Sequence, residues 1–442
     1  MYTSTIGKTF LHAYNNKFNE NYTAKTFFEE VFVPLFFNHP KYLMTAGNSP
    51  LENPKLSWDD MIKGKKEFET SERRKERINK IIDKIENEPI DASIAVGYPV
   101  ISPTAPTTSQ VSNIKLPDSK EDVYYSWIGA ALGIGVKGAI NILFDNEVLL
   151  LDIFEGWQHY REYLNKNKEL KGNQINTWNG NWISHRYDSY EYDEDDPIFG
   201  MNPLQTNNTG LLEISTISWV KVLIRISEKL SSNMIVGYLY NIGRTNTTIG
   251  FIAFNIPELK RPNLFYERIF GKSALVKDRN AIESIYGTAF GFRSACQSGS
   301  IGINALEPKG LKAYLPSKKK IKNFSIKSND NEQQITFYTY LIWIIAMMNN
   351  EKLWDLSREF AQKLLDYRAG AEKGRKNRDN DVNSLLESAT NKQFLQNLIP
   401  IIEEAEKVDD YEELGKFVNT MPKDNFPYFN TLIRFQYALL NK

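Results

Sequence analysis

The spacing of apolar residues divides the chain into helical and strand-forming parts. Closely spaced phenylalanines between residues 27 and 37 predict a helix, capped by Thr23, that is apolar on nearly every side. A long charged helix is predicted over residues 57–88, where isoleucines form a narrow apolar stripe. Another amphipathic helix is expected from Glu147 to Leu164, after the N-cap residue Asn146. The phenylalanine-rich helix is typical of a protein core or of a subunit interface.

Alternating apolar and polar residues predict strands in the middle of the chain. Three such runs cover residues 211–226, 234–242 and 247–256, and the last two flank a predicted hairpin turn. From about Glu332 onward the pattern is helical throughout, with polar breaks between amphipathic segments. The predicted fold class is α+β: a mixed α/β body with an antiparallel sheet, followed by a C-terminal helical bundle.

Three glycines, Gly133, Gly135 and Gly138, form the pattern G-x-G-x-x-G. In a dinucleotide-binding unit this pattern follows a strand and opens a helix, so that a pyrophosphate binds at the helix N-terminus. Here the order is reversed, because a helical segment precedes the glycines and a strand follows them. The sequence therefore favours a tight turn and close backbone packing over a nucleotide site.

Changes in composition give four predicted regions. Residues 99–120 are rich in proline, serine and threonine, which disfavour a regular helix, so they form a predicted linker or loop. This segment separates a helical N-terminal region with a basic helix, residues 1–98, from the mixed α/β body, residues 121–328. The helical bundle, residues 329–442, is expected to be a domain of its own.

Charge and cysteine content narrow the possible functions. The chain has 442 residues, with 54 lysines and arginines against 54 aspartates and glutamates. Any affinity for nucleic acid must therefore come from local basic patches. With a single cysteine, Cys296, the chain can form neither an internal disulfide nor a cysteine metal cluster, and a cytoplasmic location is expected. Because no apolar run is long enough to span a bilayer, no membrane partner is expected.

A polar segment, residues 172–192, combines side chains that suit nucleic-acid recognition. Amides both donate and accept hydrogen bonds and match base edges, indole rings stack on bases, and histidine and arginine reach phosphate. The alternative interpretation is an irregular polar loop held in place by two buried tryptophans. The candidate contact residues in this predicted loop are Asn173, Gln174, Asn176, Trp178, Asn179, Asn181, Trp182, His185 and Arg186.

Basic side chains outside this loop are the other candidates for contacts with nucleic acid. Lysines and arginines crowd the first half of the charged helix, and a lysine run lies near residue 320. Such clusters neutralise the phosphates of a nucleic-acid backbone without selecting a sequence. At the tip of the predicted hairpin, an exposed arginine could bind an anion. For the helix, the alternative is a solvated surface of Glu/Lys pairs. The candidates are Arg73, Arg74, Arg244, Asn246, Lys318, Lys319 and Lys320.

These features favour a non-catalytic, nucleic-acid-binding subunit of a larger assembly, because no set of side chains with compatible catalytic roles is found. In gross layout, a mixed α/β body followed by a helical domain resembles the large subunit of type I CRISPR surveillance complexes, and this resemblance implies a DNA-binding subunit of a prokaryotic defence complex. The resemblance implies that the body reads duplex DNA, through the segments at residues 173–181 and 244–248, and that the helical domain lies along the displaced strand. The expected partners are DNA or RNA and other protein subunits, without a cofactor.

Two other functions stay open. A magnesium-dependent endonuclease of the restriction type would hold its metal with carboxylates. A carbohydrate-binding or small-ligand-binding protein would instead stack tryptophans on a ring, and its binding would not depend on ionic strength. The candidate carboxylates for the nuclease are Asp145, Asp152, Glu155 and Glu213, and the candidate stacking residues are Trp178 and Trp182.

Overall fold

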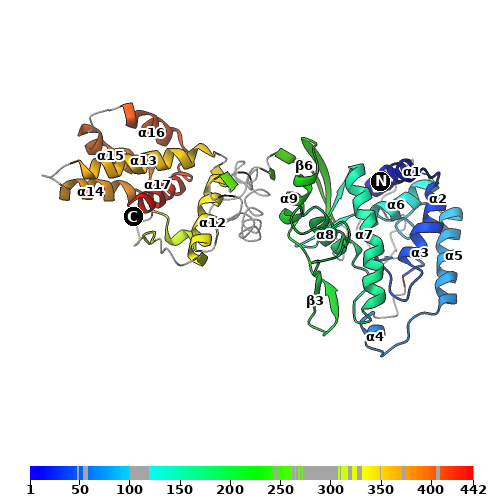
Figure 1. The fold of residues 1–442 in the computed structure, drawn as a ribbon. Coiled ribbons are helices and arrows are strands. Elements are labelled where there is room, and N and C mark those ends of the chain that lie inside the picture. The colour runs from blue at the N-terminus through cyan, green and yellow to red at the C-terminus, as the bar shows by residue number, and fades with distance from the viewer. Residues whose placement is uncertain are drawn as a thin grey trace. The chain divides into compact units, whose positions relative to one another are not determined.

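The chain folds into two compact units, Met1–Lys260 and Arg261–Lys442 (Figure 1). The fold class is α+β: the first unit contains a four-stranded antiparallel sheet and the second contains helices. Most of the predicted linker at residues 99–120 lies outside the described residues, so the finer division of the chain stays a prediction. The computed structural model describes residues 1–46, 49–52, 58–99, 119–241, 247–257, 259–260, 264, 267–268, 271, 307–308, 310–316, 321–325, 331–348, 350–370, 375–404 and 409–441.

Helices are the main secondary structure of the first unit. The predicted phenylalanine-rich helix begins at its expected N-cap, where the Thr23 hydroxyl accepts a hydrogen bond from the backbone N–H of Thr26 at 3.1 Å. The described helices of this unit are α1 (Tyr2–Phe18), α2 (Ala24–Phe27), the π-helical turn η1 (Phe28–Phe32), α3 (Val33–Phe36), α4 (Trp58–Ile62), α5 (Ser71–Asn87), α6 (Lys120–Ala131), α7 (Glu147–Lys166), α8 (Ile175–Arg186) and α9 (Trp219–Lys229).

The sheet has strands β1 (Ile134–Val136), β2 (Ile140–Phe144), β5 (Met234–Asn241) and β6 (Thr247–Asn255), hydrogen-bonded in the order β1-β2-β5-β6. All neighbouring strands are antiparallel, as the sequence predicted. A separate hairpin pairs β3 (Leu204–Thr206) with β4 (Leu212–Ile214).

The predicted strand over residues 211–226 is wrong beyond residue 214, because α9 occupies its second half. Val220, Leu223, Ile224 and Ser227 are all buried, and their spacing is that of one face of a helix. A short apolar run fits both the period of a strand and the period of a helix, so the sequence pattern alone did not distinguish the two here.

The glycine-rich segment forms a tight turn with close packing, as predicted. Gly138 lies between β1 and β2 with a φ of 89°, a conformation that favours glycine. A Cβ added at Gly133 would lie 2.4 Å from the amide nitrogen of Asn141, and one at Gly135 would lie 2.9 Å from the backbone of Asn176. The glycines therefore let α8 and β2 approach this backbone.

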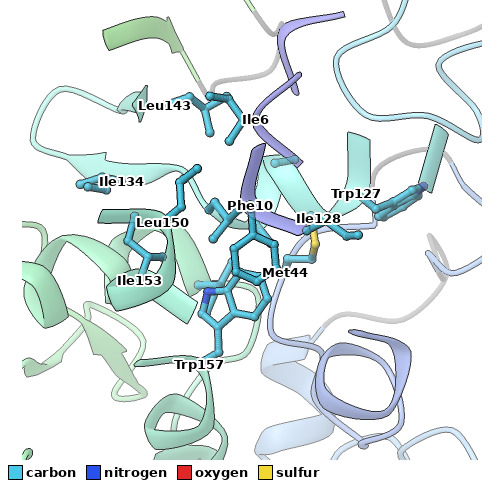
Figure 2. Packing of buried hydrophobic residues seen from close by; sticks show 14 of the residues in the cluster. Ile6, Phe10, Met44, Trp127, Ile128, Ile134, Leu143, Leu150, Ile153 and Trp157 are labelled. Carbon is cyan, nitrogen blue, oxygen red and sulfur yellow. The ribbon is translucent and has the colours of Figure 1, made fainter. Parts of the chain in front are cut away.

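The core of the first unit lies between α1, α7 and the sheet (Figure 2). The rings of Phe10 from α1 and Trp157 from α7 lie against each other, with centroids 6.1 Å apart. Ile134 and Leu143 bring buried side chains from β1 and β2 to the same cluster. Complete burial of such side chains stabilises the fold by about 2 to 3 kcal/mol each.

The helical prediction for the last part of the chain is confirmed. The second unit contains the 3-10 turn η3 (Leu311–Ala313), α12 (Asn331–Met348), α13 (Lys352–Ala369), α14 (Arg375–Leu386), α15 (Asn391–Glu403), α16 (Asp409–Thr420) and α17 (Phe426–Leu440). Its core is separate from that of the first unit. The buried amide of Asn430 in α17 donates to the carbonyls of Leu386 at 3.1 Å and Ser388 at 2.8 Å, which joins α17 to the end of α14. None of the helices in the described ranges is both long and apolar enough to cross a bilayer.

Candidate nucleic-acid interface

The segment predicted as a recognition loop is mostly helical and lies inside the first unit. Residues 175–186 form α8, and the side chains of Trp178, Asn179 and Trp182 have no exposed surface. Three fully buried side chains on two successive turns place this face of α8 in the core. The predicted loop is therefore a helix, and the alternative interpretation, in which both tryptophans are buried, agrees with the structure.

Two tryptophans join α8 to α7. The indole N–H of Trp178 donates to the carbonyl of Gly156 at 2.7 Å, and that of Trp182 donates to the carbonyl of Asp152 at 2.7 Å. The ring of Trp178 also stacks on Tyr160, with centroids 5.3 Å apart. Since both indoles are buried and hydrogen-bonded, neither ring is available to stack on a base or a sugar, and these two contact predictions are corrected.

Two asparagines of α8 hold the end of α6. The amide of Asn176 donates to the carbonyls of Ala130 at 3.0 Å and Gly133 at 2.9 Å. The amide of Asn179 donates to the carbonyls of Ala131 at 2.7 Å and Gly133 at 2.9 Å. The last carbonyls of a helix have no hydrogen-bond partner within the helix. The two amides supply these hydrogen bonds at the end of α6 and are therefore not available to bind a base.

The remaining amides of the segment also bond to backbone. Gln174 accepts a hydrogen bond from the backbone N–H of Ile214, and Asn181 donates to the carbonyl of Ser215 at 2.7 Å. With its amide nitrogen turned toward the neighbouring carbonyls, Asn173 donates to Met44 at 2.8 Å. These amides position β4 and the segment after α3, and we do not propose them as base contacts.

His185 and Arg186 do not form a phosphate site. His185 is buried, and burial lowers the pKa of its imidazole, which disfavours the charged form that would attract phosphate. Arg186 pairs with Glu155 at 3.0 Å and with Asp152 at 3.5 Å, so two carboxylates already neutralise its guanidinium. Both predictions of phosphate contact are corrected on these grounds.

The carboxylates of the nuclease alternative have structural partners or lie apart. Asp152 is buried and accepts a hydrogen bond from the hydroxyl of Tyr187 at 2.7 Å. Asp145 is exposed between β2 and α7, while Glu213 lies on β4 and accepts from the amide of Gln205 at 2.9 Å. Within the described parts of the chain, no group of three or more His, Cys, Asp or Glu could hold a metal ion.

The charged helix separates its arginines into inner and outer positions. Arg77 forms an ion pair with Glu69 and donates to the carbonyl of Pro50 at 3.1 Å, and Arg74 donates to the carbonyl of Glu69. The prediction for Arg74 is corrected, because its guanidinium is directed inward. Arg73 is exposed and remains a candidate.

The position of the isoleucine stripe around the helix could have shown from the sequence which arginines of α5 turn inward. Ile81 and Ile85 are buried, and positions 74, 77 and 78 continue the same face of α5 one and two turns earlier. Arg73 lies outside this stripe. A helical wheel anchored on the isoleucines therefore predicts which arginines turn inward.

An exposed basic surface remains on α5 and the segment before it. We define the α5 basic surface as Lys63, Lys65, Arg73, Lys75 and Lys80. Each of these side chains is exposed, and none forms an ion pair with another residue that the structure describes. Arg244, Asn246, Lys318, Lys319 and Lys320, the other predicted contacts, lie outside the described residues.

Comparison with known proteins gives no relative: no family model, curated protein or solved structure matches this chain.

Proposed function

We propose that the chain is a non-catalytic, DNA-binding subunit of a larger assembly, and that the α5 basic surface contacts the phosphate backbone. The observation that supports the proposal is the exposure of five cations along one short stretch, none of them in an ion pair with a described residue. Between residues 63 and 80, eight lysines and arginines outnumber four glutamates, for a net charge of +4 in a chain that is neutral overall. A local excess of this kind attracts a polyanion.

The chemistry of this surface favours contact with phosphate over reading of bases. Its members are four lysines and one arginine, which act as charges on flexible stems. Figure 1 places α5 along the outer side of the first unit, away from the sheet. We therefore expect binding that tolerates changes in sequence and that weakens strongly with added salt.

The larger assembly that we propose is a prokaryotic defence complex, with target DNA as the ligand. An α+β unit followed by a helical unit is the layout of the large subunit of type I CRISPR surveillance complexes, and this similarity of layout is the support for the proposal. Base pairing with a guide RNA reads most of the target sequence in such a system, so contacts to the DNA backbone are compatible with this role.

Fluorescence anisotropy with labelled duplex DNA, single-stranded DNA and RNA tests the proposal. If all five cations contact phosphate, affinity for duplex DNA should fall roughly a few hundred-fold between about 50 mM and about 200 mM salt. The variant K63E/K65E/R73E/K75E should lose affinity by at least about tenfold at the lower salt concentration.

A matched control separates the effect of losing the α5 basic surface from the effect of a change in net charge. The variant K312E/K352E/K392E/K423E reverses four exposed lysines of the second unit and changes the net charge by the same amount. This control should retain most of the affinity. Equal losses in the two variants, or no binding of the unmodified chain at low salt, would overturn the proposal.

A further inference from the structure

Two arginines on different helices of the first unit lie near each other without a carboxylate partner. Arg161 on α7 donates to the carbonyls of Leu35 at 3.1 Å and Asn38 at 2.8 Å. Arg74 on α5 donates to the carbonyl of Glu69. Both arginines are half-buried, and neither forms an ion pair with a residue in the described ranges. Their positive charges are therefore not neutralised by this part of the chain.

The segment at residues 38–42 brings the two arginines together. Arg161 bonds the carbonyl at its start, and the hydroxyl of Tyr42 at its end donates to the carboxylate of Glu69 at 3.1 Å. Glu69 is also the residue whose backbone carbonyl accepts from Arg74. Burial, and then the like charge of Arg74, lower the pKa of Arg161 to about 10, so Arg161 stays charged at neutral pH.

Two neighbouring glutamates do not neutralise the arginines, because their carboxylates have other partners. Glu69 forms its ion pair with Arg77. Glu162, next to Arg161 in the chain, pairs with Lys166 at 3.6 Å. A charge that is partly buried without a partner costs free energy, and an anion from outside the chain would offset this cost.

A buried lysine adds positive charge to the same segment. Lys41 is 4% exposed, and its ammonium group donates to the carbonyls of Asn167 at 2.8 Å, Leu170 at 2.9 Å and Lys168 at 3.4 Å. These bonds use all the donors of an ammonium group. Lys41 therefore contributes charge here, whereas the two arginines contribute free donors.

We propose that Arg74 and Arg161 together bind one phosphate group of a small molecule. Each guanidinium has five N–H groups, of which Arg161 uses two and Arg74 uses one in contacts with the described residues. The Nε of Arg74 is buried and has no hydrogen-bond partner among the described residues, and a bound oxyanion would supply one. Because Arg74 is directed inward and is not part of the α5 basic surface, this site is separate from the proposed contact with DNA.

Phosphate suits this pair of arginines better than a carboxylate or chloride. A guanidinium group is planar and presents paired donors that match two oxygens of one phosphate group. A phosphate group also carries close to two negative charges at neutral pH, and so offsets both guanidinium charges. We therefore expect inorganic phosphate to bind in preference to chloride at the same ionic strength.

Isothermal titration calorimetry with inorganic phosphate, against chloride at equal ionic strength, tests the proposal. Arg74→Met and Arg161→Met should each weaken phosphate binding by at least about tenfold, because each removes charged hydrogen bonds to the ligand. Arg378→Met is the matched control. Arg378 is also half-buried and donates to the carbonyl of Tyr367 at 2.8 Å, but Glu404 neutralises it at 2.8 Å. This control should bind phosphate like the unmodified chain.

Arginine side-chain NMR on the unmodified chain gives a second readout. Phosphate should shift the Nε–H signals of Arg74 and Arg161, each identified by its loss in the corresponding variant. Arg161 also bonds the backbone after α3, so Arg74→Met decides the question if Arg161→Met unfolds. Folded Arg74→Met should keep the affinity for duplex DNA, because Arg74 lies outside the α5 basic surface. Absence of phosphate binding, equal weakening in all three methionine variants, or loss of DNA affinity in Arg74→Met would overturn the proposal.

Discussion

Gly156 of α7 lies directly against the indole ring of Trp182, so closely that a Cβ added at Gly156 would be 2.5 Å from the ring atoms Cγ and Cδ1. The ring cannot move away easily, because its N–H is hydrogen-bonded to the carbonyl of Asp152. The absence of a side chain at position 156 is therefore what allows α7 and α8 to pack.

Gly156→Ala should destabilise the first unit. In a helix this change normally stabilises by about 1 kcal/mol, but a methyl group forced into a packed ring costs about 1 to 3 kcal/mol. We expect a net loss of up to about 2 kcal/mol in the free energy of unfolding, measured by urea denaturation. Gly415→Ala in α16 is the control, since no atom lies within 4 Å of its added Cβ. Stabilisation by both substitutions would contradict the close packing of Gly156.

Replacing the two tryptophans of α8 tests whether they are core residues or contact residues. Trp178→Ala and Trp182→Ala should each lower the free energy of unfolding by about 3 to 5 kcal/mol, because each empties a fully buried site. Protein that remains folded should keep its affinity for DNA. Thermal denaturation and anisotropy on the same samples would separate the two roles: unchanged stability with lost binding would restore the stacking interpretation.

Local patterns predicted the elements of this fold better than they predicted its surface. The caps at Thr23 and Asn146, the α5 stripe and the β5–β6 hairpin follow from short-range spacing, and the structure has all of them. In the amino-acid sequence, amide and indole side chains look the same whether they bond to a ligand or to a neighbouring helix. The interior role of Asn179 became visible only when α6 supplied the carbonyls that its amide satisfies.

The pair of Asp188 and Arg225 should be sensitive to loss of either partner. Arg225 on α9 is 1% exposed and lies 2.9 Å from the carboxylate of Asp188, which follows α8. Asp188→Asn would leave the guanidinium buried, with the carboxylate of Glu228 at 3.5 Å as a weaker partner. We expect a loss of about 3 to 5 kcal/mol in the free energy of unfolding.

A double variant provides the control for this pair. In D188N/R225M the buried charge is removed together with its partner, so part of the lost stability should return. Chemical denaturation of the two single variants and the double variant gives the coupling energy. Strict additivity of the two single effects would mean that the pair is not coupled.

His39 should make the protein less stable in mild acid. Burial, and then the nearby charge of Arg161, lower the pKa of His39 from 6.5 to about 4. Between these values the unfolded chain binds a proton that the folded chain does not, so stability should fall as pH decreases from 6.5 to 4, by up to about 1.4 kcal/mol per pH unit. Nδ1 lies 2.9 Å from the backbone N–H of Lys41 and 2.7 Å from its carbonyl, and a hydrogen bond from the protonated ring to this carbonyl opposes part of the shift in pKa. Urea denaturation across this range should show a smaller acid-dependent loss in His39→Gln, because carboxylates titrate alike in both proteins. Parallel stability curves for the two would contradict a depressed pKa for His39.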